Sequence, residues 1–166
     1  MAQALFITTK DIAEFTALNG NVDVDKFTQF IKIAQDLDVQ NYLGTDLFDK
    51  INNDIVAGTL TGNYQTLVSK YIKPMLIHFA MVQYLPWAAY TIANQGVFKH
   101  SSENSESVSK NEVDFLIDKE LSIANHYAKR FTDYICFESN LYPEYNSNSN
   151  GDMNPDKEVN FSNWFL

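Results

Sequence analysis

The sequence contains a single cysteine, Cys136, among 166 residues. One thiol cannot form an intramolecular disulfide, so the fold has to be held by a hydrophobic core, and this cysteine usage suits a reducing compartment. The N-terminal residues include no basic region, and their apolar run is too short for a signal peptide. We therefore expect a protein that remains in the cytoplasm where it is made.

Basic residues are also scarce. The chain has 12 Lys and Arg against 21 Asp and Glu, a formal net charge of −9. Proteins that bind duplex DNA by neutralising phosphates gather Lys and Arg on one face, and this composition disfavours that class. Two interpretations of the acidity stay open: a surface that DNA passes without sticking, or an ordinary acidic protein.

Motifs for chemistry are largely missing. The three histidines, His78, His100 and His126, are isolated, and no pair of residues has the spacing typical of zinc ligands. No glycine-rich phosphate loop occurs. We predict no metal, no cofactor and no enzymatic activity. A small helical enzyme that uses His126 or Cys136 remains an alternative, and it would need a cleft that converges on those residues.

The most prominent feature is a long apolar stretch over residues 64–96. Over residues 75–93 apolar side chains fall on every side of a helical wheel, whereas a surface helix confines them to one stripe. Either lipid or other helices must surround such a segment. Because His78, Gln83 and Pro86 interrupt it and no Lys/Arg cluster flanks it, we predict a central helix wrapped by other helices rather than a membrane span.

Two prolines divide this stretch. Pro74 is expected to open a helical segment at its first turn, where proline is tolerated. Pro86 is expected to kink that segment, and Gly96 to cap its end. The central segment should therefore be a bent or broken long helix.

Three shorter helices are predicted before the central segment. The first begins at Thr8, places Ile12 and Phe15 on one side and ends near the turn cluster at residues 19–21. The second begins at Asp23 and ends at Gly44, and the third begins at Thr45 or Asp46 and ends at Gly58. Their apolar stripes are Val24, Phe27, Ile31, Ala34 and Leu37 in the second helix, and Leu47, Phe48, Ile51 and Ile55 in the third.

A long final helix is predicted from Ser109, which forms a capping box with Glu112. It should run antiparallel to the central segment for about 35–40 Å. No strand or hairpin pattern stands out away from the two ends of the chain, so the predicted class is all-α, a small bundle of about five helices. The apolar stripe of the final helix is Val113, Ile117, Leu121, Ala124, Ala128, Phe131 and Ile135.

Two segments are candidates for contact with partners. Residues 97–109 are polar and serine-rich, and loops of this length are usually functional or mobile; the candidate contacts are Val97, Phe98, Lys99 and His100. We divide the chain into a helical domain, 1–138, and an extended C-terminal arm, 139–166. The arm either folds back on its own core or docks on a neighbouring chain. Its candidate partner-binding residues are Tyr142, Tyr145, Phe161, Trp164, Phe165 and Leu166.

The order and spacing of several short segments resemble the small helical head-tail connector proteins of tailed phages. The version they resemble belongs to crAss-like and related gut-bacterial phages and prophages, and the resemblance covers roughly residues 5 to 145. The segments are Ile33–Gly44, Asp46–Ile51, Leu67–Met75, Leu85-Pro-Trp87, Asn94-Gln-Gly-Val97 and Leu141-Tyr-Pro-Glu-Tyr145.

This resemblance implies a structural virion protein. Copies of the chain would form a ring of about twelve subunits below the portal protein, in the neck of the virion, and would contact other neck or tail proteins. DNA would pass through the channel without specific binding, kept mobile by like charge, and no membrane would be involved. The loop at residues 97–109 would reach the portal, a neighbour or the lumen, and the C-terminal aromatic residues would clasp the adjacent ring component.

An alternative of a different class is a cytosolic helical module that binds proteins and has no role in a virion. In that case the aromatic tail covers the groove of its own chain.

Overall fold

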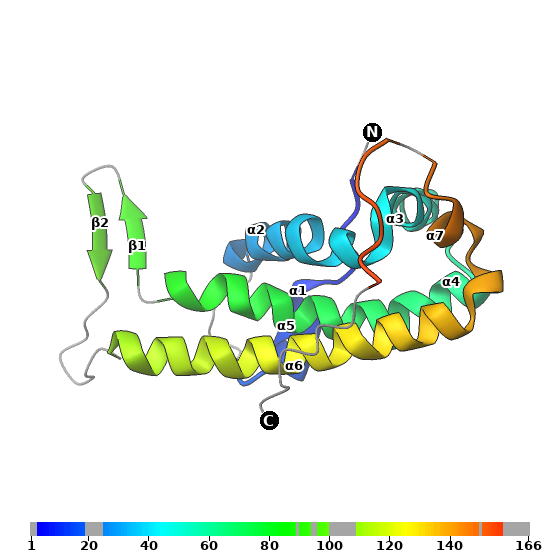
Figure 1. Ribbon diagram of the computed structural model, residues 1–166. Helices are drawn as coiled ribbons and strands as arrows, with labels where there is room; N and C mark the ends of the chain where they lie inside the picture. The colour runs from blue at the N-terminus through cyan, green and yellow to red at the C-terminus, as the bar shows by residue number, and fades with distance from the viewer. Residues whose placement is uncertain are drawn as a thin grey trace, which may run out of the picture.

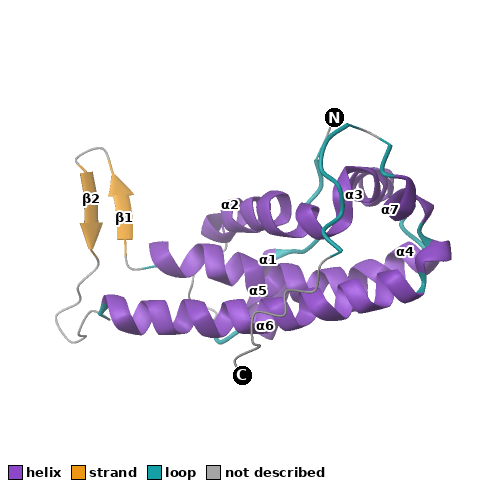
Figure 2. Cartoon of the chain, in the orientation of Figure 1, coloured by secondary structure: helices purple, strands orange, loops and turns teal. Residues whose placement is uncertain are grey.

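The computed structural model describes residues 3–18, 25–88, 90–93, 96–99, 109–149 and 151–157, with the backbone alone at 25–26, 90–93 and 96–99. The fold is all-α, as predicted (Figure 2). The α-helices are α1 (Thr9–Phe15), α2 (Asp25–Ala34), α3 (Gln40–Ala57), α4 (Gly62–Leu67), α5 (Lys73–Tyr84), α6 (Lys110–Phe137) and α7 (Pro143–Ser147). Two π-helical turns, Gln35–Val39 and Val68–Ile72, and two 3-10 turns, Leu85–Trp87 and Ser139–Leu141, join them.

Helix α5 lies at the centre of the bundle. It packs against α2 on one side and α6 on the other, and α6 runs antiparallel to it (Figure 1). Six of its side chains are buried, and they point in several directions around the helix: Met75, Leu76, Ile77, Phe79, Ala80 and Met81. The prediction of a central helix surrounded by other helices is therefore confirmed for residues 73–84.

The two prolines act differently from each other. Before Pro74 the chain makes a π-helical turn in which the N–H of Lys73 donates to the carbonyl of Val68, five residues earlier. This wider turn leaves room for a proline ring in an otherwise continuous helical run. Pro86 was expected to kink the helix, but it lies in the 3-10 turn that ends it. A proline has no N–H with which to continue the helix.

A short antiparallel hairpin follows, which the sequence did not predict. Strand β1 (Tyr90–Ala93) pairs with β2 (Gly96–Lys99), from Tyr90 opposite Lys99 to Ala93 opposite Gly96. Gly96 therefore begins a strand and does not cap the central helix. The strands hold several β-branched and aromatic residues, which favour extended backbone, but each is too short to show a pattern of its own. The hairpin projects from the end of α5 (Figure 1).

The first π-helical turn changes which side chains of the second predicted helix face the core. Phe27, Ile31 and Ala34 are buried, as predicted. Leu37 was expected to continue this stripe, but it is 60% exposed. A π-helical turn contains one residue more than an α-helical turn, so the positions that follow are rotated, and Gln35 and Val39 are buried instead.

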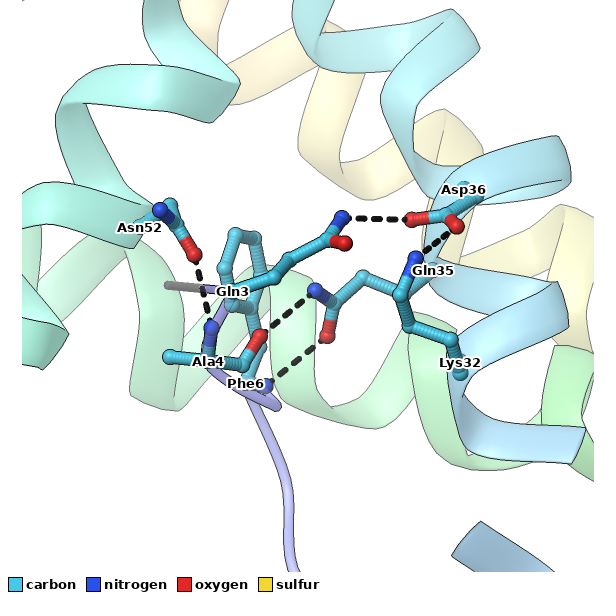
Figure 3. A network of polar contacts seen from close by, with 7 residues as sticks. All are labelled: Gln3, Ala4, Phe6, Lys32, Gln35, Asp36 and Asn52. Atoms are coloured by element: carbon cyan, nitrogen blue, oxygen red, sulfur yellow. Dashed lines mark hydrogen bonds and ion pairs between the residues drawn. The ribbon is translucent and has the colours of Figure 1, made fainter. Parts of the chain in front are cut away.

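The buried Gln35 holds the N-terminal segment against the bundle (Figure 3). Its Oε1 accepts from the backbone N–H of Phe6 at 2.9 Å, and its Nε2 donates to the carbonyl of Ala4 at 2.9 Å. Asn52 on α3 accepts from the N–H of Ala4 at 2.8 Å. Two buried amides thus satisfy backbone groups that would be costly to leave unpaired, and they fix the approach to α1.

Helix α1 is capped as predicted and tied to the centre of the bundle. The Thr8 N–H donates to Asp11, and Lys73 at the start of α5 forms an ion pair with Asp11 at 2.6 Å. Burial raises the pKa of Asp11, but the bonds from Lys73 and Thr8 outweigh it, and the net pKa is lowered. Ile12 is buried, whereas Phe15 is exposed where the helix ends, before the expected turn.

Glycines mark both helix boundaries predicted in this region. Gly58 caps α3 with a left-handed φ of 68°. Gly44 interrupts α3 with φ 72° and ψ 164°, a conformation that is essentially restricted to glycine. Residues 151–157, which we call the strap, pack on this break. The N–H of Thr45 donates to Met153 at 3.0 Å, and the N–H of Asp156 donates to Asn41 at 2.7 Å.

The substitution Gly44→Ala should destabilise the fold more than the same substitution at Gly58. A Cβ at Gly44 would lie 2.6 Å from Cδ of Pro155, whereas nothing lies within 4 Å of a Cβ at Gly58. Backbone strain and overpacking together predict a loss of about 3 kcal/mol at Gly44. Strain alone predicts about 1 kcal/mol at Gly58. Urea unfolding of both variants measures the difference, and equal losses would contradict the role of the strap.

Candidate interaction surface

The structure corrects the role expected for two of the partner-binding residues. Tyr142 and Tyr145 are 0% and 1% exposed, so they cannot dock on a partner while the chain is folded. The Tyr142 hydroxyl donates to the carbonyl of Asn63 at 3.2 Å. Tyr145 packs its ring edge-on against Phe131 of α6, with 6.4 Å between centroids. Both tyrosines complete the core of their own chain.

The other expected contact residues are only partly described. Val97, Phe98 and Lys99 form part of β2, of which the backbone alone is described. His100 and the aromatic cluster Phe161, Trp164, Phe165 and Leu166 lie outside the described residues. The first part of the arm, through α7 and the strap, packs on α3 and α6. In the described part of the chain, the helical unit thus continues from 138 to Lys157.

Two truncations should separate the packed part of the arm from its end. Deleting Phe161 to Leu166 should leave the melting temperature nearly unchanged, because Tyr142 and Tyr145 remain in place. Ending the chain at Glu138 should cost more than about 5 kcal/mol, since removing one large buried aromatic side chain typically costs 3–5 kcal/mol. Thermal unfolding followed by circular dichroism compares them. A large loss of stability in the shorter deletion would place the terminal cluster in the core.

Helix α6 changes character along its length. Its capping box at Ser109 and Glu112 forms as predicted. In its second half the predicted stripe is buried, at Ala124, Ala128, Phe131 and Ile135. In its first half the stripe is less covered, and Leu121 is exposed. Figure 1 shows the first turns of α6 running past the end of α5, which leaves them with fewer neighbours.

A second stripe runs along α6 beside the buried one. Leu116, Ile123, Arg130 and Phe137 recur every seven residues, and all four are exposed. Tyr127 and Tyr134 alternate with them and are half-buried. Positions that repeat at an average of 3.5 residues form one stripe that drifts by only about 20° per heptad, as in the seam of a coiled coil. We call these six residues the α6 seam.

The half-buried tyrosines of the seam stack on side chains of the central helical run. Tyr134 lies flat on Tyr71 with 4.1 Å between centroids and an interplanar angle of 9°. Tyr127 stacks in the same way on His78, at 5.5 Å and 9°. Nδ1 of His78 lies 2.7 Å from Oε2 of Glu120, so this histidine has a partner on α6. These contacts hold the seam in a defined geometry.

Sequence reasoning identified the buried stripe of α6 and overlooked the seam. The seven-residue spacing of Leu116, Ile123, Arg130 and Phe137 was the available signal. It was inconspicuous because a single arginine stands among apolar residues and because the tyrosines have polar ends. Trp87, in the 3-10 turn that follows α5, is a further exposed aromatic side chain.

A hollow formed by described residues lies away from the seam. It has a volume of about 370 Å³ and is lined by Asp38, Asn41, Tyr42, Phe79, Asn154 and Asp156. Burial raises the pKa of Asp38, although a hydrogen bond from Gln83 at 3.0 Å opposes the shift. Tyr42 stacks on Phe79 at 6.3 Å, and burial together with Asp156 and Asp38 raises its pKa. The hollow combines carboxylates with an aromatic wall.

Replacing Asp38 with Asn should stabilise the protein at pH 7. Because burial raises the pKa of this carboxyl in the folded state, its contribution to stability is fully present at low pH and is lost as pH rises through that pKa. Asn keeps an acceptor for Gln83 and carries no charge. The gain in unfolding free energy, measured by urea titration, should disappear near pH 3, below the ordinary pKa of Asp. A gain that is independent of pH would contradict this explanation.

The described residues contain no group of three or more His, Cys, Asp and Glu that could hold a metal ion. Cys136 is exposed on α6, and His126 lies ten residues earlier on the same helix, about 15 Å away along its axis. These two side chains therefore do not converge on one site within a chain. Among the helices described, none has the length and hydropathy needed to cross a bilayer.

A protein family described as a family of unknown function (DUF6712) matches residues 39–155. The match begins at the end of the first π-helical turn and includes α5, α6 and α7. It also includes both Gly44 and Pro155, the residues in contact where the strap meets α3. No curated protein and no solved structure matches the chain.

Proposed function

The chain belongs to the family of unknown function DUF6712, and we propose that it is a structural, non-enzymatic protein that forms a ring in the neck of a tailed phage. In this role it docks below the portal and extends the channel for DNA. The observation that carries the proposal is the α6 seam. It is an ordered stripe of apolar, aromatic and arginine side chains that the single chain leaves in contact with solvent.

The composition of the seam is typical of a protein interface. Tyrosine, phenylalanine and arginine are enriched where proteins bind one another, whereas an isolated chain gains nothing from exposing them in a line. The stacking of Tyr127 on His78 and of Tyr134 on Tyr71 reduces the freedom of these rings before any partner arrives. Preorganised side chains lose less entropy on binding, which favours assembly.

A ring subunit also needs a second surface, different from the first, for the opposite neighbour. Ile33 and Leu37 are exposed on the α2 side of the bundle, and Leu37 is turned outward by the π-helical turn. Helices α2 and α6 lie on opposite sides of α5 (Figure 1). This placement supports a head-to-tail arrangement. The net charge of −9 is compatible with a channel past which DNA moves without binding.

The alternative is a helical module whose seam takes a helix of a different protein. Both functions use an exposed seam. The second apolar surface, at Ile33 and Leu37, favours the ring, because a module that binds one ligand needs only one surface. The genes beside this one distinguish them directly: a connector gene is expected among portal, capsid and tail genes.

Replacing Ile123 with Glu tests the seam. The charge should weaken self-association of the purified protein about tenfold or more, since a carboxylate in a buried interface is strongly unfavourable. The matched control is Asn125→Glu, which adds the same charge at an exposed position that helical geometry places about 160° away on α6. Sedimentation velocity over a wide concentration range measures both. Equal association of the two variants would contradict an interface at the seam.

A further inference from the structure

Arg130 is the single arginine of the chain, and it lies in the middle of the α6 seam. Its guanidinium carbon lies 5.7 Å from the ring centroid of Tyr71 and 5.7 Å from that of Tyr127. The residue is exposed, and no carboxylate among the described residues pairs with it. It is therefore a positive charge held by two aromatic rings, without a counter-charge in the described part of its own chain.

Four lysines differ from Arg130 in having an acidic partner. Each forms an ion pair within the chain: Lys32 with Asp36, Lys50 with Asp54, Lys73 with Asp11 and Lys129 with Asp133. Lys129 is the direct neighbour of Arg130 and is exposed as well. Five other lysines likewise form no ion pair within the described residues: Lys10, Lys70, Lys110, Lys119 and Lys157. What distinguishes Arg130 is its contact with two aromatic rings at once.

The two tyrosines prepare Arg130 for a bidentate ligand. A guanidinium that contacts aromatic faces keeps its N–H groups available at its edge, and the rings restrict its rotamers. Such an edge matches the two oxygens of a carboxylate in geometry and in charge. Stacking of Tyr71 on Tyr134 and of Tyr127 on His78 fixes the rings in turn.

The chain itself supplies the complementary charge. Asp114 and Asp118 are exposed on the first half of α6, and neither makes an ion pair within the described residues. Asp118 lies twelve residues before Arg130, which places the two about 120° apart around the helix. Asp118 therefore lies outside the seam. A head-to-tail neighbour can bring a carboxylate from outside its own seam to Arg130 while its own arginine stays available for the next copy.

We propose that Arg130, held between Tyr71 and Tyr127, binds a carboxylate of the next copy of this chain. This inference rests on the proposed ring function and specifies the charged contact of its subunit interface. The apolar residues of the seam exclude water around the pair. Arg130 determines the orientation and register of the neighbouring copy, because a wrongly placed copy would leave the guanidinium without a carboxylate.

The test compares three variants of the full chain by sedimentation velocity: Arg130→Gln, Arg130→Lys and the control Lys129→Gln. Arg130→Gln and Arg130→Lys should both weaken self-association about tenfold, since an ammonium neither stacks on two rings nor binds both oxygens of a carboxylate. Lys129→Gln should stay within about twofold of the wild type, because exposed i,i+4 pairs contribute little. Circular dichroism melting confirms that all three variants remain folded.

Salt provides a second readout that a purely structural role of Arg130 would not change. Self-association of the wild type should weaken as ionic strength rises, and Arg130→Gln should show a smaller dependence. If Arg130→Gln associates like the wild type, the inference is overturned while the ring proposal stands. If Arg130→Lys associates like the wild type, a point charge suffices and the stacked geometry is overturned. A wild type that stays monomeric at every concentration overturns the ring proposal and this contact together.

Discussion

The burial of α5 is the constraint on which the rest of the fold depends. A helix with apolar side chains on every side has no polar face that could be exposed to water, so other elements must cover it on all sides. Helices α2 and α6 cover opposite sides, and the ion pair between Lys73 and Asp11 brings α1 to its start. The π-helical turn before Pro74 keeps the helical run continuous to Trp87. The second half of α6 is anchored beside α5 and by Tyr71 and Tyr145, whereas its first turns run past the end of α5 (Figure 1).

Departures from regular helix occur where other segments of the chain dock. The first π-helical turn buries Gln35, whose amide holds the N-terminal segment, and turns Leu37 outward. The break at Gly44 exposes backbone groups of α3 that the strap satisfies, and Pro155 fills the space that a side chain would otherwise take. An irregular helical turn costs free energy, and here a distant segment offsets that cost by hydrogen bonding and packing. Each irregular turn therefore links two parts of the chain that are far apart in sequence.

Local signals predicted much of this fold, and distant contacts account for what they missed. The boundaries at Gly44 and Gly58, the capping box at Ser109 and the buried stripe in the second half of α6 depend on neighbouring residues alone. The burial of Tyr142 and Tyr145 depends on Asn63 and Phe131, and the exposure of Leu37 depends on an inserted residue in a helical turn. The seam could be recognised in the sequence as a seven-residue repeat. The contact of Arg130 with Tyr71 could not, because Tyr71 lies on a different helical segment.

The central claim is that one face of α6 belongs to the core whereas its seam awaits a partner. Hydrogen exchange of the backbone amides, measured in dilute and in concentrated protein, tests it most directly. Residues 110–123 should exchange early when the protein is dilute and become protected as it associates, whereas residues 73–84 should be protected at both concentrations. If residues 110–123 gain no protection on association, α6 does not carry the interface and the claim is wrong.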